Sequence, residues 1–345
     1  MKTKLIRIYL DANIIFLLRN EKIREERSDI NLLYRFIIGS KISGKIDFPY
    51  SDAHLRDLVP SYKKEGYKYV ERDLAFLSTI SDNKCICLYE KDEMPTYAIR
   101  EPYEFFEYLI NDKSQILPTT IEEFENIFSN VEMYSLIDLF KTMPSGIDIY
   151  SLDMQSQEYF ATMYPRTYKE NNMYSFIADT LDMIRRIMTD PQEYNTLKKQ
   201  FSDYIPLDKN MGNVKCNVID SVNKNLTESC GKNFNELLGL NKQYIKSELY
   251  HKITSKYMHL DFVGYASEKL TDKNKYDNLY NDARHCFYGA YGNMFITNDK
   301  KAYKKAKAIY EEEKIETLVM NTEEFEIFAE SLLAKIDKSS ESVTI

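Results

Sequence analysis

The sequence of 345 residues predicts an α/β protein with a parallel sheet that is interrupted by a mainly helical insertion. Short apolar runs typical of buried strands lie near both ends of the chain, and segments with helical periodicity alternate with them. Glycine and proline are scarce, at 10 and 9 residues, which favours long helices over a turn-rich β-sandwich. Alternation of strands with helices is typical of a parallel sheet.

The N-terminal part begins with this alternation. Four segments carry it: a strand at 5–10, a helix start at 14–18, a helix at 30–38 and a strand at 46–50. A charged stretch at 20–29 separates the two helical segments. Ser51 follows the second strand and is expected to cap a helix that contains Leu55, Leu58 and Val59.

The middle of the chain reads differently, with helical patterns at 122–128, 175–188 and 194–201 and a polar segment at 210–232 that is expected to be a loop. The alternation then resumes with a helix at 276–291, a strand at 294–297, a lysine-rich helix at 300–310, a strand at 316–320 and an amphipathic helix at 323–336. We therefore expect one discontinuous α/β domain, residues 1–65 plus 262–337. Residues 66–261 form a mainly helical insertion of unknown role, and 338–345 form a tail.

The bulk properties restrict the class of protein. The net charge of −8 argues against a general nucleic-acid-coating protein, although a nuclease with an acidic site is compatible with it. Five cysteines without paired Cys-x2-Cys motifs fit free thiols in a reducing compartment, and Cys85 and Cys87 alternate as in a strand. No signal peptide and no membrane-spanning run of about 18 apolar residues is recognised, so a cytoplasmic protein without a membrane partner is expected.

Four aspartates lie at strand ends or on predicted helices: Asp11, Asp57, Asp282 and Asp299. Acids just beyond the carboxyl ends of strands lie where open α/β sheets bind ligands. Converging carboxylates are suited to a hard divalent cation such as Mg²⁺, which can activate water for attack on a phosphodiester. Asp52 competes with Asp57, but five helical residues correspond to about 140° of rotation, so only one is expected to point inward. The position of Ser51 favours Asp57.

These motifs occur in an order that resembles the PIN-domain nucleases, over about residues 1–65 and 262–337. The matching pieces are Ile8-Tyr9-Leu10-Asp11-Ala12-Asn13, the segment from Ser51 to Asp57, Asn281-Asp282-Ala283-Arg284-His285, Phe295-Ile296-Thr297-Asn298-Asp299, and Leu318-Val319-Met320-Asn321-Thr322-Glu323-Glu324-Phe325. The resemblance implies a three-layer α/β/α sheet and metal-dependent cleavage of RNA, less often of DNA. Two features depart from the family: its second acid is usually Glu, and the insertion of about 195 residues has no counterpart in the minimal fold.

Carried over by position, the four aspartates would be the catalytic residues and would hold Mg²⁺ or Mn²⁺, with Asn13, Ser51 and Thr297 in support. Independently of the family, His285 lies one helical turn from Asp282 and could orient its carboxylate. His54 is expected to be a packed, hydrogen-bonded core residue. Lysines after Asp299, in particular Lys300, Lys301 and Lys304, either attract substrate phosphate or form a solvated helix face.

Other interpretations remain open for the acids and for the whole protein. Asp11 and Asp299 could cap the helices that follow them, and Asp282 could solvate a helix end. The first functional hypothesis is a metal-dependent endonuclease, with RNA favoured as the nucleic-acid partner. The alternative is a catalytically silent PIN-like module that binds a protein partner, or a second copy of itself, through the insertion. An aspartyl phosphatase is disfavoured, because that chemistry typically needs a second Asp where Asn13 stands.

Overall fold

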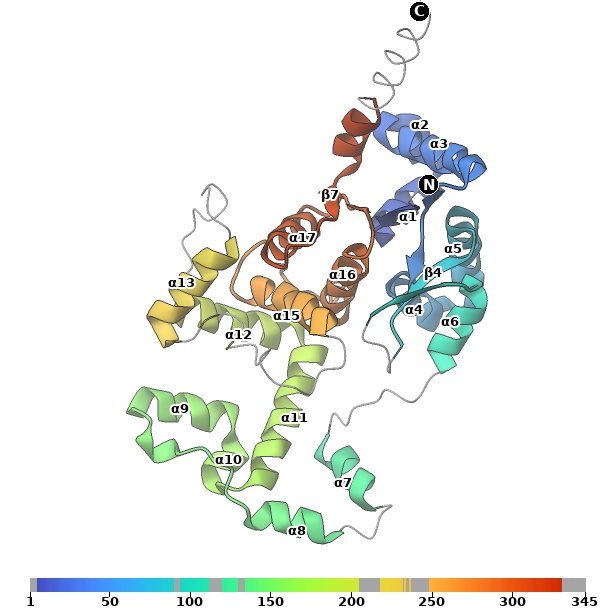
Figure 1. Cartoon of the computed structure of the whole chain (residues 1–345). Coiled ribbons are helices and arrows are strands. Elements are labelled where there is room, and N and C mark those ends of the chain that lie inside the picture. Colours follow the sequence, from blue (N-terminus) through green and yellow to red (C-terminus); the bar gives the residue numbers. More distant parts are fainter. Residues whose placement is uncertain are drawn as a thin grey trace, which may run out of the picture. The chain divides into compact units, whose positions relative to one another are not determined.

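The structure, a computed structural model, describes residues 5–89, 94–111, 120–129, 134–204, 218–231, 233, 236 and 248–330. The chain consists of two compact units, whose elements are labelled in Figure 1. Unit 1 comprises Met1–Asn111, Lys198–Glu268 and Asn278–Ile345, and unit 2 comprises Asp112–Leu197 and Lys269–Asp277. All four predicted aspartates belong to unit 1.

A four-stranded parallel sheet lies at the centre of unit 1. Its strands, in spatial order, are β2 (Ile46–Asp47), β1 (Ile6–Leu10), β6 (Met294–Ile296) and β7 (Leu318–Met320). Leu10 pairs with Ile296, so β1 and β6 end at the same level although 286 positions separate them along the chain. The predicted α/β class with a parallel sheet made from the two ends of the chain is confirmed.

Three helices follow β1, and the first and third of them bury residues in the core beside this sheet. They are α1 (Ala12–Arg19), α2 (Glu21–Glu26), which occupies most of the charged stretch and has no buried residue, and α3 (Ser28–Ser43). Ile14 and Leu18 are four residues apart on α1 and pack with Ile8 and Leu10 of β1 in one core. This burial fixes the position of the turn that carries Asp11.

The predicted strand at 46–50 is two strands that belong to different sheets. After β2 the chain passes Phe48 and Pro49 and continues as β3 (Tyr50–Ser51), which pairs in parallel with β4 (Lys84–Cys87). Proline has no N–H to donate to a ladder, which favours a break at this point. β4 also pairs with the antiparallel β5 (Thr96–Ile99), and the predicted strand at Cys85 and Cys87 is confirmed.

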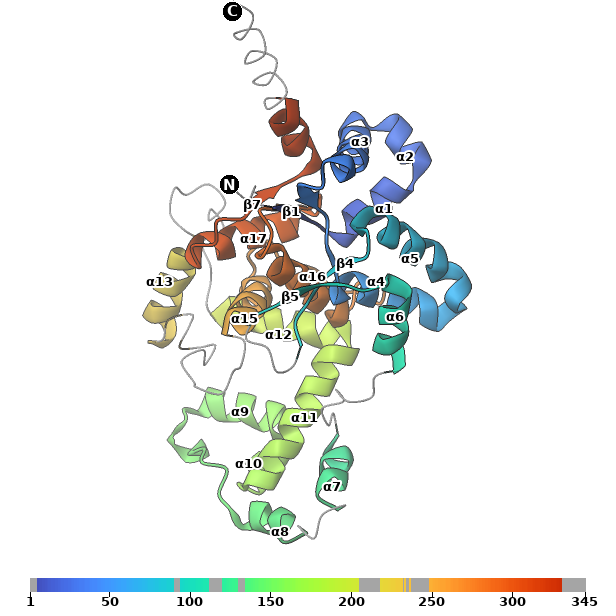
Figure 2. The ribbon, with the colours of Figure 1, turned by 45° about the vertical axis from the view of Figure 1, so that its right-hand side comes forward.

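Three helices pack around this second sheet. They are α4 (Asp52–Glu65), α5 (Tyr67–Ser81) and α6 (Pro102–Asn111), which Figure 2 shows beside β4 and β5. Leu55, Leu74 and Phe106 are fully or almost fully buried in their common core. Ser51 is the N-cap of α4 as predicted, since its hydroxyl accepts a hydrogen bond from the Ala53 N–H at 3.2 Å.

The C-terminal half of unit 1 supplies further helices. These are α13 (Val218–Cys230), α15 (Glu248–Phe262), α16 (Tyr276–Gly289), α17 (Lys300–Glu312) and a helical segment at 322–330. The expected loop at 210–232 was wrong over 218–230, where apolar positions spaced as Ile219, Val222 and Leu226 are buried. Residues 210–217 and 232 of that segment, and 331–336 of the predicted last helix, lie outside the described residues.

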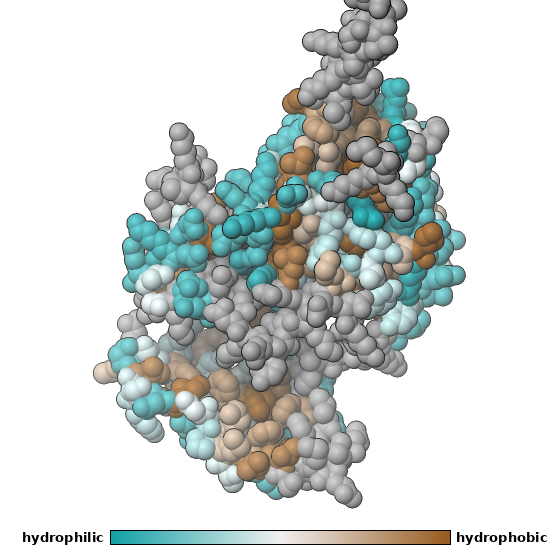
Figure 3. All heavy atoms as spheres, in the orientation of Figure 1, coloured by the Kyte–Doolittle hydropathy of each residue, from teal (hydrophilic) through white to brown (hydrophobic). Residues whose placement is uncertain are grey.

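Unit 2 is helical over its described residues, apart from one isolated bridge between Pro144 and Asn172. Its helices are α7 (Ile121–Ser129), α8 (Tyr134–Thr142), the 3₁₀ turn Ile149–Ser151, α9 (Met154–Met163), α10 (Pro165–Lys169) and α11 (Met173–Thr189), while α12 (Pro191–Tyr204) spans the boundary with unit 1. Figure 3 shows hydrophobic residues on the visible face of this unit. Tyr150 of the 3₁₀ turn and Met154 of α9 are exposed. Among the residues that the structure describes, no helix combines the length and apolar character needed to cross a membrane.

The predicted insertion boundaries differ from this division. The sequence places 66–261 outside the α/β domain, whereas the contacts keep residues up to Asn111 and from Lys198 in unit 1. The reason lies in β4, which pairs with β3 directly before α4 and so joins α5 and α6 to the same unit. β3, the partner that brings β4 next to α4, has only two residues and leaves little alternation in the sequence.

The close approach of α16 to β6 yields a prediction. A Cβ added at Gly289 would lie 2.7 Å from Phe295 Cγ and 2.8 Å from Tyr310 Oη, so Gly289→Ala should lower the free energy of unfolding by about 1–3 kcal/mol. Gly39→Ala is the matched control, because nothing lies within 4 Å of its added Cβ and alanine favours a helix. Urea unfolding measures both, and equal stability of the Gly289→Ala variant and the parent would contradict this packing.

Candidate active site

The carboxyl ends of β1 and β6 form a topological switch point. From β1 the sheet continues to β2 on one side, and from β6 it continues to β7 on the other, so the connections diverge. Asp11 follows β1 directly, and Thr297 to Asp299 follow β6. Open α/β sheets bind ligands in the crevice at such a point, which makes these residues the start of a candidate site.

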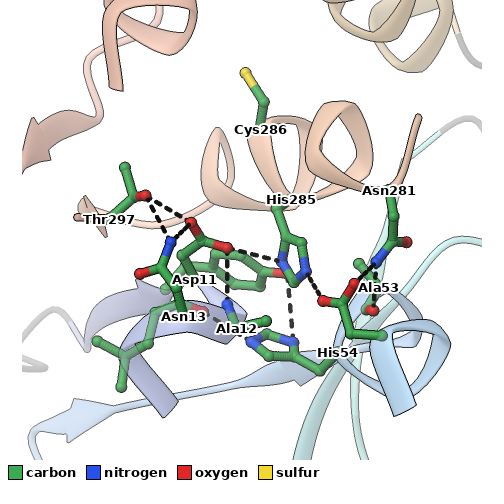
Figure 4. A network of polar contacts seen from close by, with 12 residues as sticks. Asp11, Ala12, Asn13, Ala53, His54, Asn281, His285, Cys286 and Thr297 are labelled. Atoms are coloured by element: carbon green, nitrogen blue, oxygen red, sulfur yellow. Dashed lines mark hydrogen bonds and ion pairs between the residues drawn. The ribbon is translucent and has the colours of Figure 1, made fainter. Parts of the chain in front are cut away.

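The Asp11 carboxylate is held by three donors. Its Oδ1 accepts a hydrogen bond from the Ala12 N–H at 2.7 Å, and its Oδ2 accepts from Asn13 Nδ2 at 2.6 Å and from Thr297 Oγ1 at 2.5 Å. Figure 4 shows Asn13 and Thr297 on the same side of Asp11. Asp11 is thus both the N-cap of α1 and a buried acid between two strand ends, with Asn13 and Thr297 in contact with it as the sequence predicts.

Asp57 is oriented by α16. Its Oδ1 accepts a hydrogen bond from Asn281 Nδ2 at 2.6 Å, and its Oδ2 accepts from His285 Nε2 at 2.9 Å. His285 Nδ1 lies 4.0 Å from Asp11 Oδ1, so the imidazole bridges two of the predicted acids (Figure 4). We expected His285 to orient Asp282; instead it orients Asp57, because its ring crosses from α16 to α4.

Asp52, the competitor of Asp57, has a different role. Its Oδ2 lies 2.9 Å from both Arg56 Nε and Arg284 Nη1. Burial raises the pKa of Asp52, but the charges of Arg284 and Arg56 outweigh it and the pKa is lowered. Both acids of α4 therefore reach α16, contrary to the expectation that only one points inward. Asp52 is neutralised by arginines, and Asp57 is the acid connected to Asp11.

Asp282 is the least supported carboxylate of the four. In the described part of the chain it makes no hydrogen bond and no ion pair, and its side chain is partly exposed. Burial and then the charges of Asp11, Asp57 and Asp299 raise its pKa well above the ordinary value. Asp11, Asp57 and Asp299 are thus close enough to repel the charge of the Asp282 carboxylate.

Asp299 is the N-cap of α17. Its Oδ1 accepts hydrogen bonds from the N–H groups of Lys301 at 2.7 Å and Ala302 at 2.9 Å, and its own N–H donates to Thr297 Oγ1 at 3.1 Å. The capping alternative is therefore confirmed for Asp299, as it is for Asp11. A cap does not exclude a second role, because Asp299 Oδ2 accepts no hydrogen bond from the described residues.

A buried tyrosine connects the strand to both histidines, and the sequence did not single it out. Tyr9 Oη lies 2.7 Å from Ser51 Oγ and 2.8 Å from His285 Nδ1. Ser51 is connected to the acids only indirectly, through the Tyr9 hydroxyl, because its contacts with the described residues include no carboxylate. The available signal was a polar hydroxyl in a buried strand, two residues before Asp11 and therefore on the same side of β1.

His54 is a packed core residue, as predicted. Its Nε2 donates to the Leu10 carbonyl at 2.7 Å, and its Nδ1 accepts from the Ser51 N–H at 3.1 Å. Burial and the neighbouring His285 lower the pKa of His54 to about 3, so it is neutral at physiological pH. A neutral imidazole with both nitrogens engaged in this way serves to hold β1 against α4.

The predicted phosphate-binding lysines have three different environments. Lys300 and Lys304 are exposed and form no ion pair with the described residues. Lys301 lies 3.1 Å from Glu268. Lys305 of the same helix is fully buried and pairs with Asp261 at 2.9 Å, so it has a structural role. Lys300 and Lys304 are the two of the predicted set that remain available for a phosphate.

Two cavities bear on the location of a ligand. One, of about 490 Å³, adjoins the acids and is lined by residues of α1, α4 and α5 that include His54 and Asp57. The other, of about 430 Å³, lies along β7 and α17 and contains none of the predicted acids. Within the described ranges, no group of three or more His, Cys, Asp or Glu side chains is close enough together to hold a metal ion.

Comparisons of the chain with protein-family models, curated proteins and solved structures found no match.

The contact between Asp57 and His285 gives a prediction about protonation. Burial lowers the pKa of His285, but the hydrogen bond and charge of Asp57, with the charges of Asp11 and Asp52, outweigh it and raise the pKa above 6.5. The stabilisation from the charged pair is present below pH 6.5 and is lost as the pH rises through the folded-state pKa. NMR titration in EDTA should therefore give a His285 pKa above 6.5, and a lower value in Asp57→Asn.

Asp47→Asn is the control for that titration, because Asp47 pairs with Lys84 at 2.5 Å and does not contact His285. It should leave the pKa of His285 unchanged. If the pKa of His285 is the same in Asp57→Asn as in the parent, the contact with Asp57 does not stabilise the protonated imidazole.

Proposed function

We propose that the protein is a metal-dependent endonuclease, with RNA favoured as the substrate, that hydrolyses phosphodiester bonds with Mg²⁺ or Mn²⁺. The observation that carries the proposal is Asp282, a carboxylate without a hydrogen-bond partner in the described chain that is repelled by Asp11, Asp57 and Asp299. Like charges in one site raise the free energy of the folded state unless a proton or a cation lies among them. Their position at a switch point supports a catalytic use of that cation.

The residues present fit a hard divalent cation in chemistry and charge. Carboxylate oxygens are preferred ligands of Mg²⁺, which keeps several waters and needs few direct protein ligands. Asp282 and the unbonded Oδ2 of Asp299 would hold the ion, and Asp11 and Asp57 would contribute charge beside it. Such an ion lowers the pKa of bound water and stabilises charge on a phosphoryl group.

The protein side chains have separable tasks in this reaction. Asn13 and Thr297 fix the Asp11 carboxylate through hydrogen bonds of 2.6 and 2.5 Å, so it does not reorganise as charge develops. His285 Nε2 keeps Asp57 turned toward the site, and Tyr9 locks the imidazole from the other nitrogen. A charged His285 also reduces the repulsion between Asp11 and Asp57 when a substrate phosphate approaches.

The positive charge needed to attract that phosphate lies on the first turns of α17. Lys300 and Lys304 are exposed beside the Asp299 cap, and exposed lysines near a phosphate contribute mainly to attraction. The preference for RNA over DNA comes from the resemblance to PIN-domain nucleases. We therefore expect RNA to be cleaved faster than DNA.

The activity test uses labelled single-stranded RNA and DNA with the purified protein in Mn²⁺ or in EDTA. We expect cleavage only with the metal, and a loss of about 100-fold or more in Asp11→Asn and Asp282→Asn, because each change removes charge from the cation site. Asp47→Asn, whose carboxylate pairs with Lys84, should cleave as the parent does. Metal-independent cleavage, or an Asp11→Asn variant as active as the parent, would overturn the mechanism.

A second test does not depend on activity. Mn²⁺ at about 100 times its Kd should stabilise the parent by about 2.7 kcal/mol in thermal unfolding, and Asp282→Asn should remove most of this gain. In EDTA the same variant should be more stable than the parent, increasingly so as the pH rises above about 4. The reason is that a raised folded-state pKa gives stability that is lost with rising pH. An equal Mn²⁺-dependent gain in stability in the parent and in Asp282→Asn would show that the cation does not bind at Asp282.

One observation favours the catalytically silent alternative. Asp57 and Asp299 both have hydrogen-bond partners, and the described side chains include no ready group of three metal ligands. A protein that binds RNA without cleaving it under any metal condition, and without a Mn²⁺-dependent gain in stability, would support this second function.

A further inference from the structure

The cavity beside Asp57 differs in character from the acidic site. Three helices of unit 1 form it, and its lining includes Phe16 and Arg19 of α1, Asp57 and Lys64 of α4, and Tyr69 and Asp73 of α5. Its volume of about 490 Å³ lies within the 300–1,000 Å³ range of small-ligand sites. Ala12 follows Asp11, and Asp57 itself contributes to the wall, so the cavity is continuous with the candidate site.

Two exposed aromatic rings lie at this cavity. Phe16 and Tyr69 each leave 53% of their surface accessible, whereas Leu18 on α1 and Leu74 on α5 are buried. The Tyr69 hydroxyl is hydrogen-bonded to Glu65, and the Arg19 guanidinium lies 5.5 Å from the centroid of the Phe16 ring. Rings held by such contacts offer flat faces at a small cost in conformational entropy.

The charges of the lining disfavour a phosphate as the occupant. Two cations, Arg19 and Lys64, face three carboxylates, Asp57, Glu65 and Asp73. Arg19 forms an ion pair with Asp73, and Lys64 lies 3.4 Å from Glu65, so both positive charges are already compensated. A flat, neutral group with hydrogen-bonding edges suits this lining better than an anion does.

We propose that the cavity binds a nucleobase of single-stranded RNA next to the scissile phosphate, with Phe16 and Tyr69 as the stacking surfaces. The inference rests on the proposed nuclease function, because it places that phosphate at the acids. Every base has an aromatic face, so stacking tolerates different sequences. A duplex keeps those faces covered by neighbouring base pairs, so the cavity selects single-stranded or splayed-out nucleotides.

The test measures binding without cleavage, by fluorescence anisotropy of labelled RNA octamers with the full chain in EDTA. Phe16→Ala and Tyr69→Ala should each weaken binding of a single-stranded octamer about 10-fold, within the range for loss of one stacking ring. Tyr69→Phe keeps the ring and should bind as the parent does. Tyr108→Ala is the matched control, because Tyr108 on α6 is similarly exposed, at 57%, but does not line the cavity.

Two further probes separate the base from the backbone. A duplex of the same sequence, and an octamer that lacks its two central bases, should bind with affinities that Phe16→Ala and Tyr69→Ala leave unchanged. Parent-like binding of the single strand by both alanine variants overturns the inference, and so does a parent that binds the duplex as tightly as the single strand.

The outcomes also distinguish this inference from the proposed function. Loss of single-strand binding in the two alanine variants, with no metal-dependent cleavage by the parent, would support the base site and refute the nuclease. Metal-dependent cleavage that requires Asp11 and Asp282, together with unchanged binding in the alanine variants, would support the nuclease and refute the base site.

Discussion

Repulsion among four carboxylates at the carboxyl ends of β1 and β6 is the constraint that the rest of unit 1 accommodates. Asp282 shows it most directly, because its pKa is raised both by burial and by three neighbouring acids. The fold offsets the repulsion at the other positions with donors: Asn13 and Thr297 for Asp11, backbone N–H groups for Asp299, and α16 side chains for Asp57. Asp282 alone is left without such a donor in the described chain.

The placement of these donors depends on long-range packing. His285 contacts Asp57 because α16 lies across the end of β1, where Tyr9 joins it to Ser51. His54 then ties the same region to the backbone of Leu10. One tyrosine hydroxyl therefore links a strand, a helix cap and a histidine, and buried networks of this kind hold a single arrangement when every member is satisfied.

Much of the first sheet could be predicted from the sequence, because strands such as 5–10 and 294–297 are compact apolar runs with polar ends. Asp11 and Asp299 could be found for the same reason, because each follows such a strand, whereas Asp57 and Asp282 lie on helices and were singled out by the order of the motifs. The second sheet could be predicted only in part: the alternation of Cys85 and Cys87 indicates β4, but β3 has only two residues and its pairing with β4 is not visible in the sequence. The assignment of His285 to Asp57 also required the fold, because 228 positions separate the two residues.

The polarity of the sequence was likewise misleading at 218–230, where polar residues outnumber the three buried apolar ones, Ile219, Val222 and Leu226. Weak intrinsic preference is readily overridden by burial of a narrow apolar stripe. The unit boundary near Asn111 has no composition signal of its own. The boundary follows from tertiary packing, because α4, α5 and α6 share one core with β4.

Gly289 bears on how relatives of this chain could be recognised. The absence of a side chain there allows Phe295 of β6 and Tyr310 of α17 to pack against α16, the helix that carries Asp282. Most core residues can be replaced by others of similar volume, whereas a side chain at position 289 would overlap with both rings. A search profile built on an acid, a glycine seven positions later and a Thr-x-Asp motif after the next strand would therefore tolerate wide divergence elsewhere.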